Sequence, residues 1–270
     1  MPRLDVCLET VFTDRCYAER IRAAARCQVR TVEFWFTDMT FDDDGPKAVP
    51  KDAAELALAL KEAAVGVSNM VLNAPEGAHG GSLLDPQDRR KVVDRLHDSL
   101  RFAEKLDCRR LIVCAGNALD GVSISAQRDS MLATLAEAAE AAEAEGAELL
   151  LEPLNTKVDH PGYFLDSADE AAAVVRSIGS PALRLLFDLY HMQIMRGDLL
   201  GFIEANLDAI GHFHAAGVPG RHELFLSEVD YRFILRRLDE LGYKGFVGLE
   251  YYPSMPDHEQ SLREVVRHLS

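Results

Sequence analysis

The feature of this sequence that most constrains its fold is an alternation of short apolar runs with longer helix-like segments along the whole chain. Such alternation is typical of a parallel sheet whose strands are joined by covering helices. Eight strand–helix pairs can be counted. The predicted strands cover residues 4–8, 31–34, 67–72, 110–115, 148–151, 183–187, 210–215 and 246–249. The predicted helices cover residues 14–28, 51–65, 86–107, 124–146, 167–178, 199–208, 230–241 and 258–269.

Eight such pairs in 270 residues predict an α/β fold of the closed (β/α)8 type, a TIM barrel forming one domain over residues 1–270. The apolar runs are similar in length, and none stands out as the edge strand that an open sheet would need. A doubly wound sheet that binds a dinucleotide would also carry a glycine-rich turn after its first strand. The residues at that place are Glu-Thr-Val-Phe at 9–12, so this alternative lacks its motif.

The charge of the chain limits its partners. With 44 acidic and 29 basic residues the formal net charge is -15, which would repel a nucleic-acid backbone. The five cysteines are scattered and show no Cys-x-x-Cys spacing, so we expect reduced thiols. No apolar signal core and no 18-residue apolar run occur. We therefore expect a cytoplasmic protein that binds neither nucleic acid nor membranes, and a homo-oligomer is left open.

Four side chains that can bind a metal stand at the ends of predicted strands. They are Glu152, Asp188, His214 and Glu250. The carboxyl ends of barrel strands share one face, so we expect the four to converge there. Three carboxylates with one imidazole suit Mn²⁺ or Mg²⁺, with Co²⁺ a further option, better than structural zinc. The alternative is four separate acids or bases, each bonded to nearby backbone groups.

Other polar or aromatic side chains fall near the same strand ends. His191 could donate to a substrate oxygen, and Arg221 could anchor a carboxylate or hydroxyl groups through its planar fork. Glu33 and Trp35 share a face at the end of the second strand, where Trp35 could form a wall of the pocket. Ordinary packing or surface exposure is the alternative for each. His212 is expected to be a core histidine.

Several motifs resemble those of hydroxypyruvate isomerases, which belong to the xylose isomerase-like barrel superfamily together with the ketose 3-epimerases. The motifs are Glu-Pro-Leu-Asn at 152–155, His-Pro-Gly-Tyr at 160–163, Asp-Leu-Tyr-His-Met-Gln at 188–193, Ile-Gly-His-Phe-His at 210–214, Pro-Gly-Arg-His-Glu at 219–223 and Gly-Leu-Glu-Tyr at 248–251. The resemblance implies that the four strand-end residues bind the metal and that Glu152 and Glu250 also transfer protons. It extends to Asn73, in an Asn-Ala-Pro segment, as a substrate-site residue.

Two positions depart from the hydroxypyruvate isomerase pattern. His214 and Gly217 stand where that pattern has Gln and Asp, and a histidine is closer to the epimerases. Both reactions remove a weakly acidic C–H beside a carbonyl, a task for a carboxylate base and a metal that stabilises the enediolate. The expected function is a metal-dependent isomerase of a small hydroxy-keto acid or sugar in carbohydrate metabolism. Conversion of hydroxypyruvate to tartronate semialdehyde is the leading reaction, and a ketose 3-epimerase is the alternative.

Three more distant functions are less well supported. A barrel glycosidase would use two carboxylates and no metal. A metal-dependent endonuclease would need more histidines and a basic face, which the net charge of -15 argues against. A non-catalytic binding protein would keep the barrel without the activity, although the complete ligand set argues for an enzyme.

Overall fold

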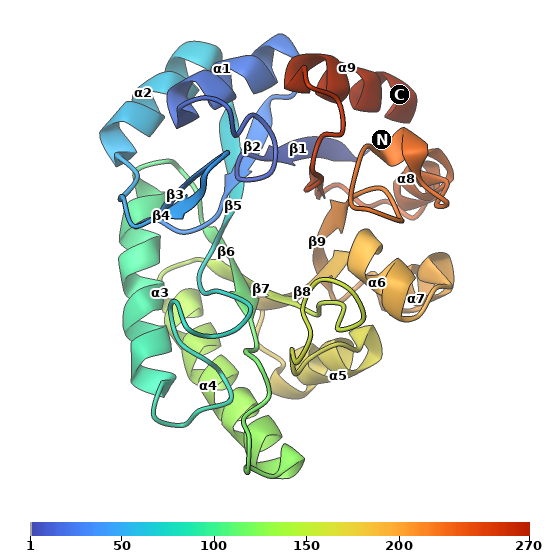
Figure 1. Cartoon of the computed structure of the whole chain (residues 1–270). Coiled ribbons are helices and arrows are strands. Elements are labelled where there is room, and N and C mark those ends of the chain that lie inside the picture. Colours follow the sequence, from blue (N-terminus) through green and yellow to red (C-terminus); the bar gives the residue numbers. More distant parts are fainter. Residues whose placement is uncertain (1) are drawn as a thin grey trace. The chain divides into compact units, whose positions relative to one another are not determined.

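The computed structural model describes residues 2–270, and its parallel strands close into a barrel in the order β1-β10-β9-β8-β7-β6-β5-β2 (Figure 1). The predicted TIM barrel is confirmed. The barrel strands are β1 (Arg3–Cys7), β2 (Thr31–Phe34), β5 (Gly66–Val71), β6 (Arg110–Cys114), β7 (Glu148–Glu152), β8 (Leu183–Asp188), β9 (Ile210–Ala215) and β10 (Phe246–Leu249). The helices are α1 (Tyr17–Arg26), α2 (Ala53–Ala63), α3 (Arg89–Glu104), α4 (Ile124–Ala144), α5 (Ala168–Ile178), α6 (Leu189–Met195), α7 (Leu199–Asn206), α8 (Tyr231–Glu240) and α9 (His258–Leu269), with a 3-10 turn, η1 (Leu224–Leu226).

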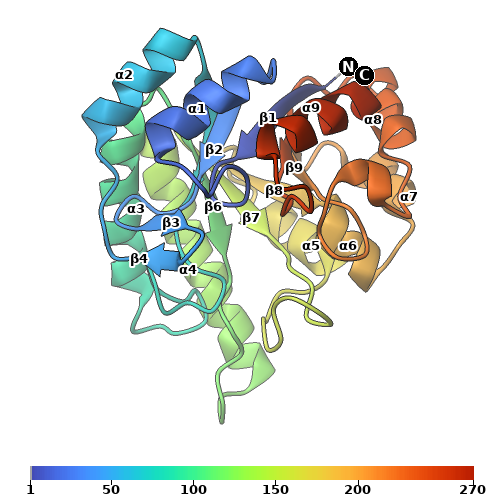
Figure 2. The same cartoon turned by 45° about the horizontal axis from the view of Figure 1, so that its top comes forward.

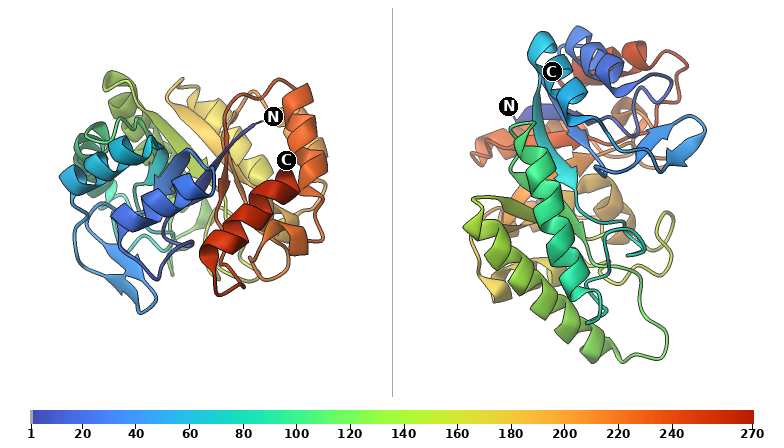
Figure 3. Two further views of the ribbon diagram at one scale, coloured as in Figure 1. Left: turned by 90° about the horizontal axis from the view of Figure 1, so that it is seen from above. Right: turned by 90° about the vertical axis from the view of Figure 1, so that its left-hand side faces the viewer.

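Besides the short turn η1, two features of the fold were not predicted from the sequence. One is an antiparallel hairpin, β3 (Thr40–Asp42) and β4 (Gly45–Lys47), which projects from its unit in Figure 3. The other is α6, which begins directly after β8 because Asp188 accepts hydrogen bonds from the backbone N–H groups of Tyr190 and His191. Among residues 2–270, no helix is long and apolar enough to cross a membrane.

The chain divides into two compact units by its internal contacts. The first unit contains residues 2–70, 102–108 and 213–270, and the second contains residues 71–101 and 109–212. A single domain over residues 1–270 stays a prediction.

In the first unit, strand register sets two pairs of positions opposite each other. Cys7 of β1 pairs with Glu33 of β2, and Gly248 of β10 pairs with His214 of β9. Helices α1 and α9 lie side by side in Figures 2 and 3, and α1 also packs on α2. Each helix buries one apolar face; in α8 the buried residues recur at helical spacing, from Tyr231 to Leu238.

In the second unit, β7 pairs with β6 and β8. Cys114 of β6 lies opposite Glu152 of β7, and Leu151 lies opposite Leu185 of β8. The long helix α4 is rich in alanine and begins where Ser123 accepts a hydrogen bond from the N–H of Ala126. Helix α5 begins at a similar cap, Ser167. The second unit therefore presents Glu152 and Asp188 at the ends of neighbouring strands.

Candidate active site

The four predicted metal ligands lie at the ends of barrel strands. Glu152 ends β7, Asp188 ends β8, His214 lies near the end of β9, and Glu250 follows β10 directly. All four are buried. Two groups of acidic and histidine side chains within residues 2–270 could hold a metal ion. They are Glu152, Asp188, His214 and Glu250, and Glu33, His212 and His214.

Glu250 is surrounded by donors from the first unit. Arg221 forms an ion pair with its Oε2, and the Arg221 Nε donates to the Glu250 backbone oxygen over 3.3 Å. The indole Nε1 of Trp35 donates to Oε1 over 3.1 Å. The Cys7 thiol lies 4.0 Å from the same oxygen. Predicted substrate-site residues Arg221 and Trp35 are therefore direct neighbours of the predicted proton carrier.

The surroundings of Glu250 favour its ionised form. Burial on its own would raise the pKa of this carboxyl, but Arg221 and then His214 outweigh burial and lower the pKa below its usual value. Burial, followed by the charges of Glu250, Glu33 and Glu9, raises the pKa of the Cys7 thiol. Glu250 is thus a carboxylate next to a neutral thiol, in the ionised form that a metal ligand needs.

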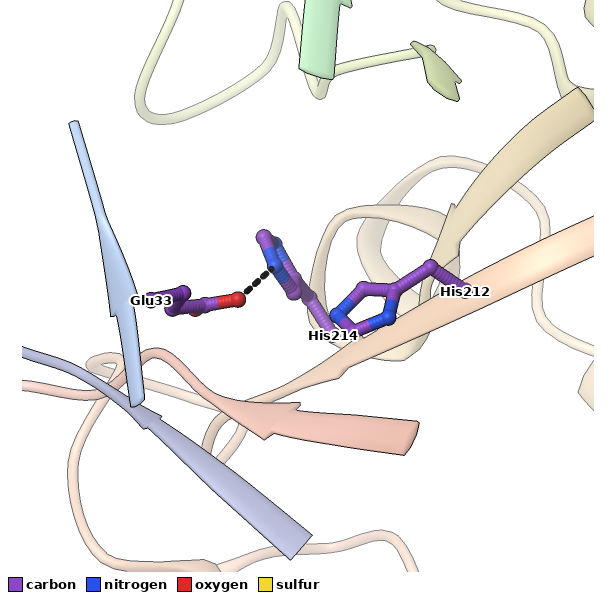
Figure 4. Close-up of side chains that lie close together, drawn as sticks. All are labelled: Glu33, His212 and His214. Carbon is purple, nitrogen blue, oxygen red and sulfur yellow. Dashed lines mark hydrogen bonds and ion pairs between the residues drawn. The ribbon is translucent and has the colours of Figure 1, made fainter. Parts of the chain in front are cut away.

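Glu33 contacts His214 rather than standing alone in the pocket. The His214 Nε2 lies 3.1 Å from the Glu33 Oε2, as Figure 4 shows, and the His214 Nδ1 lies 3.5 Å from the Glu250 Oε2. His212 lies on the same strand, two residues earlier, and is fully buried as expected of a core histidine. The imidazole of His214 is therefore held between two carboxylates.

Gly248 provides the space that His214 and Glu33 occupy. A Cβ atom at position 248 would lie 2.7 Å from the His214 Cδ2 and 3.0 Å from the Glu33 Oε2. Any larger residue would push these two side chains apart. Within the first unit, the Glu250 carboxylate and the His214 imidazole are ligands of the kind that a hard divalent cation takes.

In the second unit, Asp188 and His191 are arranged around Asn155. The Asp188 Oδ1 caps α6, while its Oδ2 lies 3.6 Å from the His191 Nε2. The His191 Nδ1 lies 2.6 Å from the side-chain Nδ2 of Asn155 and 3.4 Å from its backbone N. Because both nitrogens of Asn155 are donors, the neutral imidazole carries its proton on Nε2, facing Asp188.

Glu152 is tied to the barrel through its backbone. The Tyr163 hydroxyl donates to the Glu152 carbonyl over 2.8 Å and accepts from the N–H of Ala115 over 2.7 Å. Burial, the largest influence, raises the pKa of Tyr163 well above its usual value, so the phenol stays protonated. Tyr163 therefore fixes the strand end that carries Glu152.

Asn73 uses its side chain to hold the following loop. Its Nδ2 donates to the carbonyls of Gly81 and Cys114 over 2.8 and 2.9 Å, and its Oδ1 accepts from the N–H of Cys114 over 2.9 Å. A role for Asn73 in substrate binding stays a prediction, as do the roles of His191, Arg221, Glu33 and Trp35.

Sequence reasoning missed three side chains of the site. Asn155 and Tyr163 belong to quoted motifs, but nothing in their spacing revealed which atoms they contact. Asn69 donates to the Glu33 Oε2 over 2.9 Å. It follows Ser68 in an otherwise apolar strand, and this polar pair was a signal that could have been used.

Comparison with known proteins identifies the family. Residues 21–270 match the sequence profile of the Xylose isomerase-like TIM barrel family. The 2-oxo-tetronate isomerase of Cupriavidus necator is 34% identical over 257 residues, 94% of each chain. A human protein named "Putative hydroxypyruvate isomerase" is 37% identical over 207 residues, 73% of this chain and 74% of its own.

Solved structures agree on the fold. A crystal structure named AP endonuclease, family 2, from Brucella melitensis superposes with a TM-score of 0.87 and 31% identity, covering 99% of both chains. The 3-keto-D-glucoside 4-epimerase of E. coli superposes with a TM-score of 0.80 at 18% identity, covering 100% of this chain and 99% of the other, and shows the fold alone. The resemblance noted in the sequence is confirmed. The chain is an enzyme, and it belongs to the Xylose isomerase-like TIM barrel family.

Proposed function

We propose that this enzyme is a metal-dependent isomerase of short α-hydroxy keto acids, with hydroxypyruvate to tartronate semialdehyde as the specific reaction. The observation that carries the proposal is the set of buried residues at strand ends, Glu152, Asp188, His214 and Glu250. Relatives named for isomerisation of 2-oxo-tetronate and of hydroxypyruvate support the same class of substrate.

Glu152, Asp188, His214 and Glu250 would hold the divalent ion, Mn²⁺ or Mg²⁺ with Co²⁺ as a further option. When bound, the ion supplies positive charge near the two substrate oxygens on which negative charge develops. Oxygen-rich coordination with one imidazole is the chemistry expected for these ions.

The proton transfers would fall to the two glutamates. One carboxylate removes a C–H proton from the hydroxymethyl carbon of hydroxypyruvate, and the electron pair forms the enediolate. A proton then returns to the neighbouring carbon, and the hydroxyl proton of the first carbon passes to the oxygen of the second. These transfers leave an aldehyde at the first carbon and a hydroxyl at the second. Arg221 keeps Glu250 ionised, which is the form in which a carboxylate can accept a proton. Arg221 and His191 would orient the substrate's oxygens, with Trp35, Glu33 and Asn73 lining the pocket.

A ketose 3-epimerase is the second candidate, because His214 matches the epimerases better than the hydroxypyruvate isomerases. An endonuclease activity is disfavoured by the formal charge of -15. The five free cysteines fit a reducing compartment, so we place the enzyme in the cytoplasm.

Substrate assays after metal replacement test this function. The protein is stripped with a chelator, reloaded with Mn²⁺, Mg²⁺ or Co²⁺, and incubated with hydroxypyruvate, 2-oxo-tetronate, fructose or tagatose, with products read by NMR. We expect turnover of the keto acids only with metal. Turnover of ketoses alone would establish the epimerase, and full activity in the chelated protein would contradict metal dependence.

A further inference from the structure

A row of buried polar side chains leads from His214 into the interior of the first unit. The His214 Nε2 lies 3.1 Å from the Glu33 Oε2, and the Asn69 Nδ2 donates to that same oxygen over 2.9 Å. The Asn69 Nδ2 also lies 3.2 Å from the Ser68 Oγ, which donates to the Asp5 Oδ2. All five side chains are buried.

Such a row is costly unless it has a function, because a barrel interior of this size can be filled with apolar side chains. The Asn69 amide and the Ser68 hydroxyl connect the carboxylates of Glu33 and Asp5. Buried polar groups linked in this way hold one another in a single geometry. The group that this network fixes nearest the proposed metal site is the Glu33 Oε2.

The position of Glu33 determines which nitrogen of His214 can bind a metal. Both ring nitrogens face a carboxylate, but the Glu33 Oε2 lies 3.1 Å from Nε2, whereas the Glu250 Oε2 lies 3.5 Å from Nδ1. The closer acceptor, Glu33, therefore holds the proton of the neutral imidazole on Nε2. The lone pair is then on Nδ1, the nitrogen that lies 3.5 Å from the Glu250 Oε2. Hydrogen bonding of this kind fixes the tautomer of histidine ligands in metalloproteins.

We propose that Glu33 is a positioning residue that presents the His214 Nδ1 to the metal, and that Asn69, Ser68 and Asp5 hold Glu33 in place. The proposal rests on the proposed function, because it assumes that His214 is a ligand. It assigns to Glu33 a role other than substrate contact. It also argues against a second metal ion bound by Glu33, His212 and His214. Such an ion would need the His214 Nε2, which the hydrogen bond to Glu33 already uses.

The test compares Glu33→Gln with the wild type. A glutamine side chain can donate to Nε2, which favours the tautomer with its proton on Nδ1. We expect the affinity for Mn²⁺, measured by calorimetry on stripped protein, to fall by about 10- to 100-fold. At saturating Mn²⁺, the loss of kcat in Glu33→Gln relative to the wild type should be smaller than its loss of Mn²⁺ affinity. Glu55→Gln, which removes the same charge from an exposed position on α2, is the matched control and should bind Mn²⁺ as the wild type does.

A second variant and a second readout keep the test independent of folding and of activity. Ser68→Ala leaves Glu33 unchanged but removes the link from Asn69 to Asp5, and should lower the Mn²⁺ affinity in the same direction by less. In ¹⁵N-histidine-labelled, metal-free protein, the His214 imidazole should be protonated on Nε2 in the wild type. An Nδ1 proton in the wild type, or two Mn²⁺ ions per chain, would overturn the proposal. So would Mn²⁺ affinity unchanged in both variants.

The same measurements separate the two proposals. A wild type that binds Mn²⁺ and shows the Nε2 proton, but turns over no keto acid, would refute the proposed function and leave the role of Glu33 intact. A wild type that turns over keto acids, with Mn²⁺ affinity unchanged in Glu33→Gln and Ser68→Ala, would refute only the role of Glu33.

Discussion

Arg221 forms a buried ion pair with Glu250, and its Nε also donates to the Glu250 backbone oxygen. The guanidinium therefore holds both the side chain and the strand end that carries it. Arg221 adopts a left-handed backbone conformation with φ of 58°. Through its contacts with Glu250, the loop after β9 completes the surroundings of this carboxylate.

Arg221→Met should cost stability because it leaves the Glu250 carboxylate buried without its guanidinium. We expect a loss of about 3–5 kcal/mol, measured by urea unfolding of metal-free protein at pH 7. The pKa of Glu250 is lowered in the folded state, so this stabilisation is present above the usual pKa of 4.5 and is lost as the pH falls below it. The difference between the wild type and Arg221→Met should therefore narrow in acid. A difference that stays constant down to pH 3 would contradict the ion pair as its cause.

Gly248→Ala should displace His214 and Glu33, since the added Cβ would lie 2.7 Å from the His214 Cδ2. We expect a loss of about 1–3 kcal/mol in stability together with weaker Mn²⁺ binding. Gly66→Ala is the control, because a Cβ at Gly66 has open space within 4 Å. Equal effects of the two substitutions on Mn²⁺ binding would show that the space beside His214 is unimportant.

Lys51 is a buried cation that ties the β3–β4 region to the end of β1. Its Nζ donates to the carbonyls of Phe36 and Met39 over 2.5 and 2.6 Å and lies 3.0 Å from the Glu9 Oε1. Lys51→Met would leave Glu9 as a buried carboxylate without its cation, at a cost of about 3–5 kcal/mol. Urea unfolding checks this, with exposed Lys61→Met as the control. Adding Glu9→Gln to Lys51→Met should restore part of the lost stability. A further loss of stability in the double variant would refute the pairing of Lys51 with Glu9.

His258 should make stability fall in mild acid. Its Nδ1 accepts the N–H of Phe12 over 2.9 Å, and burial, followed by the nearby charge of Arg15, outweighs Asp14, Asp43 and Glu223 to lower the pKa of this histidine below 6.5. The unfolded chain then binds the proton first, so stability declines as the pH falls below 6.5 and levels off below the folded pKa.

His258→Gln isolates this effect. Glutamine can accept the Phe12 N–H through its side-chain oxygen and does not titrate. Stability is measured from urea midpoints at pH 8, 6 and 5. As the pH falls, the wild type should lose stability relative to His258→Gln. His268→Gln on the same helix is the control. A wild type that loses no stability relative to His258→Gln between pH 8 and 5 would contradict a lowered pKa for His258.

The barrel could be predicted because its strands are apolar runs separated by helices with clear boundaries. The β3–β4 hairpin escaped prediction because it is short, partly exposed and contains Pro46, so it has no alternating pattern. Helix α6 escaped because Asp188 is both the last residue of β8 and the cap of the helix. From the sequence, Asp188 was interpreted only as the end of a strand, so its second role as a helix cap was missed.

Candidate residues for the site could be proposed from the sequence, but their partners could not, and the roles of these residues stay predictions. Strand ends identified Glu152, Asp188, His214 and Glu250, because position in a barrel strand determines which face a side chain reaches. The contacts of Glu33 with His214, and of His191 with Asn155, join residues far apart in the sequence. Spacing along the chain carries no information on such pairs, and only the packed structure supplies it.

The most direct test of the proposed chemistry is exchange of the substrate C–H with solvent. Hydroxypyruvate is incubated in D₂O with the Mn²⁺-loaded wild type, with Glu152→Gln and with Glu250→Gln, and deuterium uptake at the hydroxymethyl carbon is followed by NMR. Glu55→Gln controls for the loss of one charge. We expect rapid uptake in the wild type and Glu55→Gln, and none above background in Glu152→Gln and Glu250→Gln. Uptake at the wild-type rate in both of these glutamine variants would contradict proton transfer by Glu152 and Glu250.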